Sequence, residues 1–200
     1  MLLLPADVIL TRSDTWLGRA IRAAERRGSD TASYNHVGVV VSAGELPPQD
    51  GDWRLAPFGP VMVEALGHVL RRPVWEGYGP QVKDQNAIAV YRPLNLEPGQ
   101  GQSIARSAMA YVGERYGWWK LFFHLGDAVI SKVAGRDVRL LRRALFVKSR
   151  PICSFLVAKA FAAVGLGFGV KPGSADPDDV ADFCRQNPDK YELIFEGRLS

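Results

Sequence analysis

Cysteine is scarce in this chain, which has only Cys153 and Cys184 among its 200 residues. The sequence contexts of the two cysteines differ, and neither has a second cysteine at the spacing of a metal site. We therefore expect neither a disulfide framework nor a zinc site. We also expect no other metal ion and no cofactor.

A long uncharged apolar run is missing as well. The nearest approach to one, residues 118–133, is interrupted by four charged or titratable side chains: Lys120, His124, Asp127 and Lys132. No membrane-spanning helix is therefore predicted. The apolar N-terminus, residues 1–5, is too short for a signal peptide. We expect a cytoplasmic protein, or an exported one whose signal has been removed.

The chain has no large excess of charge of one sign, since 25 lysines and arginines stand against 21 aspartates and glutamates. The basic residues gather in segments 19–27 and 136–150, and the second segment contains few aromatic residues. Such runs are typical of solvated helix faces, so we expect no nucleic acid as a partner. An anionic membrane surface stays an alternative partner. Nothing in the sequence predicts the oligomeric state.

The segment around Cys153 has the pattern of a reactive thiol. Residues 149–165 read Ser-Arg-Pro-Ile-Cys-Ser-Phe-Leu-Val-Ala-Lys-Ala-Phe-Ala-Ala-Val-Gly, a basic turn followed by a mostly apolar helix. Pro151 suits the start of a helix and Gly165 its end, so Cys153 is predicted in the first turn. Unpaired backbone N–H groups and the helix dipole favour a nucleophilic thiolate there. The alternative is a small, buried, inert cysteine.

Two strands carry a histidine and a glutamate that could assist this thiol. Residues 34–42 form the clearest strand pattern, and period two puts His36 on the same face as Gly38 and Val40. Residues 61–66 form the next strand, with Glu64 beside Met62. Burying a lone carboxylate is costly without a partner. Glu64 therefore either faces water at an edge or orients His36, as in a chain of nucleophile, base and orienter.

The chain shows no internal repeat, low-complexity tract or linker, so residues 1–200 are predicted to form a single domain. β-rich or alternating runs predict further strands at residues 7–11, 69–74, 87–93 and 191–195. Apolar spacing and capping residues predict helices at residues 16–27, 97–113, 116–133 and 178–184. Residues 43–60 and 75–85 are predicted to be irregular.

Five segments in this order resemble a known family: Ala6-Asp-Val-Ile-Leu10, Tyr34-Asn-His-Val-Gly-Val-Val-Val41, Val63-Glu-Ala65, Val90-Tyr-Arg-Pro93 and Ile152-Cys-Ser-Phe-Leu-Val157. The order is similar to that of the circularly permuted branch of the NlpC-type, papain-like cysteine hydrolases, in particular the YiiX-like proteins. The resemblance covers nearly the whole chain. It departs in having Ala6 where the pattern has glycine, and in a longer segment 118–150.

The resemblance implies an α+β fold in which the cysteine helix packs against an antiparallel sheet. It implies Cys153 as nucleophile, His36 as general base and later acid, and Glu64 as the residue that orients the imidazole. We further expect the substrate to contact four polar or aromatic residues: Tyr34, Asn35, Tyr116 and Trp118. His68 is expected at the surface or the edge of the cleft, and Cys184 is expected to be structural.

The activity that follows is hydrolysis of an amide bond through a thioester, as the resemblance implies for small cell-wall-derived peptides. Residues 116–123 are rich in aromatic side chains and precede the basic segment, so a lipid ester or amide hydrolase, or an acyltransferase, is an alternative. A second alternative is a ligand-binding module that keeps the fold without turnover.

Overall fold

The computed structural model describes residues 1–15, 18, 19, 22, 33–46, 59–79, 85–115 and 152–197 of the chain. Within these residues, six strands form one sheet in the order β6-β5-β3-β2-β7-β8. Each strand is antiparallel to its neighbours. The strands are β2 (Val8–Ser13), β3 (His36–Ser42), β5 (Val61–Ala65), β6 (Val69–Pro73), β7 (Gln85–Pro93) and β8 (Tyr191–Gly197). A small second sheet pairs β1 (Leu2–Leu3) with β4 (Gly44–Glu45).

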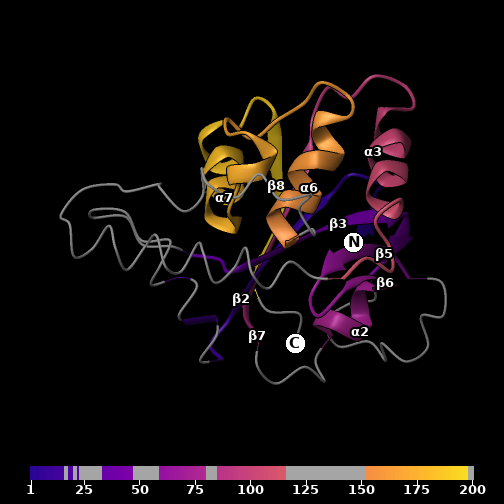
Figure 1. Cartoon of the computed structure of the whole chain (residues 1–200). Coiled ribbons are helices and arrows are strands. Elements are labelled where there is room, and N and C mark those ends of the chain that lie inside the picture. Colours follow the sequence, from indigo (N-terminus) through magenta and orange to yellow (C-terminus); the bar gives the residue numbers. More distant parts are fainter. Residues whose placement is uncertain are drawn as a thin grey trace.

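Helices lie on both faces of the large sheet. Figure 1 shows α6 (Cys153–Ala162) between α3 (Gln100–Met109) and α7 (Pro177–Gln186) on one side. The short helix α2 (Val74–Tyr78) lies on the other side, beside β5 and β6. We call these sides the helix face and the α2 face. The predicted α+β class with an antiparallel sheet is confirmed, whereas a single domain over residues 1–200 stays a prediction.

Strand periodicity separates two apolar clusters. On the helix face, Val37, Val39 and Val63 pack with buried residues of α3, α6 and α7. On the α2 face, Val40 and Met62 pack with Val74 and Tyr78. Successive side chains of a strand point to opposite faces, so these clusters place His36 and Glu64 on the α2 face. The predicted facing of both strands is confirmed.

Helix α6 begins at Cys153, so the predicted position of this residue in the first turn is confirmed. Seven of the ten residues of the helix are buried, in agreement with its mostly apolar sequence. After Ala162 the chain turns at Gly165, whose φ of +78° is a left-handed conformation that glycine adopts without strain. The Leu166 N–H then donates to the Phe161 carbonyl and closes the helix end.

Two regions predicted to be irregular contain regular structure. Residues 74–78 form α2, directly after Pro73 has ended β6. A helix this short shows no apolar repeat in a sequence, which is why the periodicity did not predict it. Gly44 and Glu45 form β4 at the start of the predicted loop 43–60. The predicted helix at residues 116–133 and most of that at 16–27 lie outside the described residues.

Candidate active site

Glu64 lies at the centre of the site and is fully buried. Its strand, β5, runs between β3 and β6. Gly38 of β3 is directly opposite Glu64, and Leu70 of β6 is opposite it on the other side. A buried carboxylate requires hydrogen bonds or opposite charge to offset its lost hydration. Glu64 therefore does not face water at an edge, which was one of the two predicted alternatives.

His36 supplies the first of those partners. Its Nε2 is 2.6 Å from Glu64 Oε2. His36 is two residues from Gly38 on the same face of β3, so the imidazole reaches the carboxylate across the glycine. A Cβ on Gly38 would come within 2.3 Å of Met62 Cε and 3.3 Å of Glu64 Cβ. Gly38 therefore leaves the room that Met62 and Glu64 occupy.

Arg72 and Tyr78 are the other partners of Glu64, and the sequence did not reveal either. Arg72, opposite Met62 on β6, donates from Nε and Nη2 to Glu64 Oε1. The Tyr78 hydroxyl, from α2, donates to Oε2. Arg72 follows Leu70 at period two, but only the register of β6 against β5 shows that its side chain reaches Glu64. His36, Arg72 and Tyr78 thus supply the hydrogen bonds and the positive charge that offset the lost hydration of Glu64.

Cys153 approaches His36 from the other face of the sheet. It is the first residue of α6, it is buried, and it lies close enough to His36 to raise the pKa of the imidazole. Because Nε2 of the imidazole contacts Glu64, Nδ1 is the ring nitrogen left for the thiol. His36 is the first residue of β3, so its ring can reach round the end of the strand. The structure brings Cys153, His36 and Glu64 together as a chain.

The protonation of these groups follows from their contacts. Burial alone would lower the pKa of His36, but negative charge and hydrogen bonds at Cys153 and Glu64 raise it to about 10. Burial alone would raise the pKa of Glu64, yet His36, Arg72 and Tyr78 hold it below its ordinary value. Burial and Glu64 raise the pKa of Tyr78 well above the usual range. At neutral pH the site therefore contains an imidazolium, a carboxylate and a neutral phenol.

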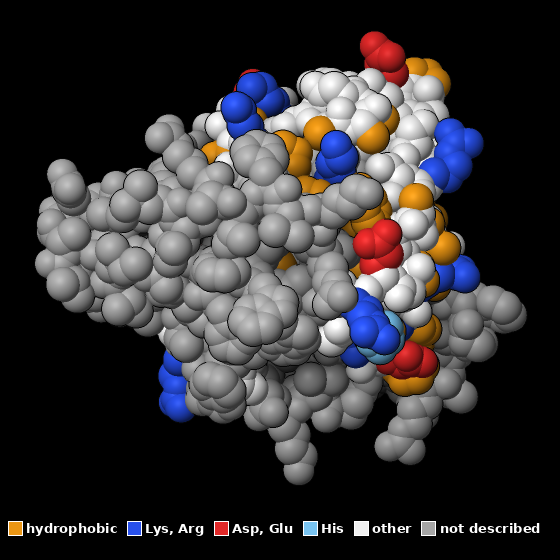
Figure 2. Space-filling view, viewed as in Figure 1, with side chains coloured by type: hydrophobic (Ala, Val, Ile, Leu, Met, Phe, Trp, Pro, Cys, Tyr) orange, Lys and Arg blue, Asp and Glu red, His pale blue; other side chains and the backbone are white. Residues whose placement is uncertain are grey.

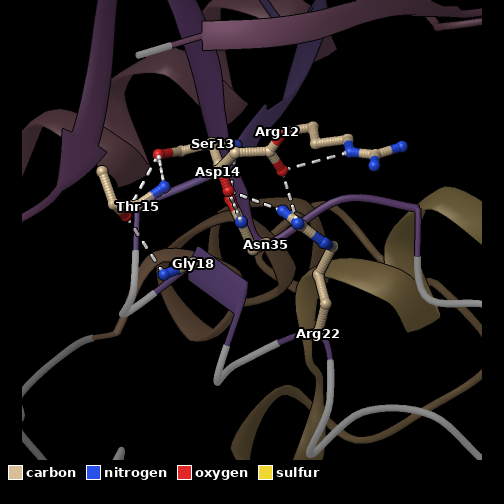
Figure 3. A network of polar contacts seen from close by, with 7 residues as sticks. All are labelled: Arg12, Ser13, Asp14, Thr15, Gly18, Arg22 and Asn35. Carbon is tan, nitrogen blue, oxygen red and sulfur yellow. Dashed lines mark hydrogen bonds and ion pairs between the residues drawn. The ribbon is translucent and has the colours of Figure 1, made fainter.

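Asn35, predicted to contact the substrate, is bound to the neighbouring strand. Its Nδ2 donates to the Ser13 carbonyl at 2.7 Å, and its Oδ1 accepts from the Ser13 N–H at 3.2 Å. Arg22 donates to the same carbonyl and to Asp14 (Figure 3). This network joins the end of β2 to the residue that precedes His36. Asn35 is thus placed to fix the start of β3.

The other predicted residues are distributed widely. Tyr34 is buried, and its hydroxyl donates to Glu196 of β8 at 3.1 Å. Tyr116 and Trp118 lie outside the described residues, so their predicted contact with substrate stays a prediction. His68 is exposed in the residue before β6, as expected. Cys184 is buried in the helix-face core, and burial raises the pKa of its thiol far above the usual range.

Attachment to an anionic membrane surface stays a prediction. Figure 2 shows lysine and arginine side chains scattered among acidic and hydrophobic ones, rather than gathered on the face in view. The basic segment 136–150 lies outside the described residues. Within the residues that the structure describes, no helix has both the length and the apolar character needed to cross a bilayer.

Comparison with known proteins shows a similarity in fold to a solved structure. No protein-family model and no curated protein sequence matches the chain. A crystal structure does: the metalloprotein yiiX from Escherichia coli O157:H7 superposes with a TM-score of 0.50 at 20% identity, over 97% of this chain and 86% of that one. At this level of identity the similarity concerns the fold alone. It agrees with the expected relation in fold to YiiX-like proteins.

Proposed function

We propose that this protein is a cysteine hydrolase with the permuted, papain-like arrangement of the NlpC type. The observation that supports this most is the buried group Cys153, His36 and Glu64, in which the imidazole lies 2.6 Å from the carboxylate and the neighbouring cysteine raises the pKa of the imidazole. A nucleophile, a base and an orienting acid in hydrogen-bonding sequence are what acyl transfer requires. A structural cysteine has no need of such partners.

The reaction forms and then hydrolyses a thioester. At neutral pH His36 already holds the proton taken from the thiol, as an imidazolium, and Cys153 Sγ attacks the substrate carbonyl carbon as a thiolate. The first backbone N–H groups of α6 lack carbonyl partners within the helix, so we assign them to the oxyanion. The C–N bond breaks as His36 returns the proton to the leaving nitrogen. Water, deprotonated by His36, then attacks the thioester carbon; the C–S bond breaks and releases the acid.

The YiiX neighbour is described as a metalloprotein, but the residues of this site do not fit a metal ion. Within the described residues, no group of three or more His, Cys, Asp and Glu side chains could hold one. Both oxygens of Glu64 already accept from N–H and O–H donors. One of these donors is the permanent cation Arg72, which would repel a divalent ion. No step of the proposed mechanism therefore passes through a metal.

The substrate we propose is an amide in a small, cell-wall-derived peptide. Assays on cell-wall peptides and on short-chain acyl esters, each with Cys153→Ala as control, test this directly. We expect amide cleavage that depends on Cys153. Ester release with no peptide cleavage, together with salt-sensitive binding to anionic vesicles, would favour the lipid enzyme instead. No Cys153-dependent turnover on either substrate class would favour the binding module.

A further inference from the structure

Arg72 holds the side of Glu64 that faces away from His36. Its Nε and Nη2 both donate to Oε1, whereas His36 and Tyr78 contact Oε2. Both N–H groups converge on one oxygen, so the guanidinium fixes the position of Oε1 and leaves Oε2 to His36 and Tyr78. The Arg72 side chain is 25% exposed, against none for Glu64. Arg72 therefore connects the buried acid to the surface.

The guanidinium sits in a place that α2 provides for it. A Cβ on Gly77 would lie 2.6 Å from Arg72 Nη2 and 2.7 Å from Cζ, closer than real Cβ atoms approach such groups. The guanidinium carbon is also 5.6 Å from the centre of the Tyr78 ring. Alanine is a better helix former than glycine. Gly77 nevertheless leaves the space that the Arg72 guanidinium occupies. Both β6 and α2 therefore contribute to the pairing of Arg72 with Glu64.

Three of the groups in the site carry charges of alternating sign: the imidazolium of His36, the carboxylate of Glu64 and the guanidinium of Arg72. His36 faces Cys153 of α6 and Glu64 of β5, and Glu64 faces Arg72 of β6 and Tyr78 of α2. Tyr78 stays neutral because burial and Glu64 raise its pKa well above the usual range. Arg72 is thus the group in this set whose charge is independent of pH.

We infer that Arg72 is a positioning residue: it fixes Glu64 and offsets part of its charge, so that His36 is oriented and can still release its proton. This rests on the proposed function, because the proton in question is the one that the leaving nitrogen receives. If Arg72 did not offset the negative charge of Glu64, that charge would stabilise the imidazolium of His36 more strongly. The imidazolium would then be a weaker acid and a poorer proton donor.

The test is the pH dependence of Cys153 alkylation by iodoacetate, with the labelled cysteine identified by peptide mass spectrometry. Iodoacetate is an anion that the imidazolium of His36 attracts. The rate of Cys153 alkylation should therefore fall at alkaline pH, where His36 loses its proton. We expect Arg72→Gln to move this fall upward by about half to one pH unit. Arg72→Lys, which keeps the charge, should restore most of the parent profile.

Two further variants separate positioning from simple structural support. Arg71→Gln removes a neighbouring exposed charge and should leave the profile unchanged. Gly77→Ala keeps Arg72 but displaces its guanidinium, and should move the alkaline fall in the same direction by a smaller amount. It also provides the measurement if Arg72→Gln does not fold. A purely structural role would lower the rate at every pH without moving the profile.

The outcomes distinguish this inference from the proposed function. Suppose that Cys153 of the parent protein is more reactive than an ordinary thiol, but that folded Arg72→Gln and Gly77→Ala have the same alkylation profile as the parent. Arg72 then has no positioning role, and the proposal that Cys153 is the nucleophile is unaffected. If parent Cys153 reacts as an ordinary thiol, the proposed function fails and the inference fails with it.

Discussion

The two faces of the sheet bury different kinds of side chain. The helix face buries apolar side chains from α3, α6 and α7 in one large cluster. The α2 face has a smaller apolar cluster and, next to it, the buried Glu64 with its three polar partners. Apolar burial stabilises a fold without regard to direction, whereas a buried charge requires particular partners in a particular geometry. We therefore expect substitutions on the two faces to have different consequences.

The largest effect on stability is expected on the helix face. Phe161 is fully buried on α6, with its ring centre 4.9 Å from that of Phe168 and 6.4 Å from that of Tyr191. Phe161→Ala should lower the free energy of unfolding by about 3–5 kcal/mol, because it removes apolar contacts and leaves a cavity. Urea denaturation measures this. The Cys153 alkylation profile of the remaining folded protein should not move; a shift would show that the faces are not separate.

On the α2 face the larger effect should be on chemistry. In Glu64→Gln, the amide oxygen would accept from Arg72 and leave the NH₂ group to face His36. The imidazole would then carry its proton on Nδ1, the nitrogen that must accept from Cys153. We expect kcat/KM to fall by about 10³-fold, less than in Cys153→Ala. Equal activity of Glu64→Gln and Glu64→Ala with the parent would remove Glu64 from the site.

Acid should weaken the α2 face before it affects apolar contacts. The folded pKa of Glu64 is lower than its ordinary value, so its stabilising effect is present above that value and is lost as pH falls through the folded pKa. The free energy of unfolding should therefore decrease below about pH 4.5, by up to about 1.4 kcal/mol per pH unit from this group. Glu64→Gln should flatten this slope. An identical slope in the two proteins would contradict the assigned ion pairs.

The smallest effect is expected at Ala6, where the resembling family has glycine. Ala6 has a φ of +79°, which an alanine adopts at a cost of about 1–2 kcal/mol. Its methyl group is buried, which returns about 0.8 kcal/mol, and glycine would make the unfolded chain freer by about 0.4–1 kcal/mol. Ala6→Gly should thus change stability by no more than about 0.8 kcal/mol in either direction. Thermal unfolding measures it, and a loss above about 1.5 kcal/mol would contradict this balance.

The sequence by itself determined the local directions. Alternation placed His36 with Gly38 and Glu64 with Met62, and the structure confirms both facings. Pro151 and Gly165 bounded a helix whose first residue is Cys153. These features follow from the periods of strand and helix and from the conformational limits of proline and glycine, which act over a few neighbouring residues.

Only the tertiary structure decided which of those residues meet. The strand order puts β5 between β3 and β6, and the register places Arg72 opposite Met62, from where its side chain reaches Glu64 on the side away from His36. The same packing brings Tyr78 to Glu64 from a helix too short to show a pattern, and binds Asn35 to Ser13. Register depends on how whole faces pack together rather than on any local signal. The sequence therefore singled out Cys153, His36 and Glu64, while packing determined which groups hold Glu64 in place.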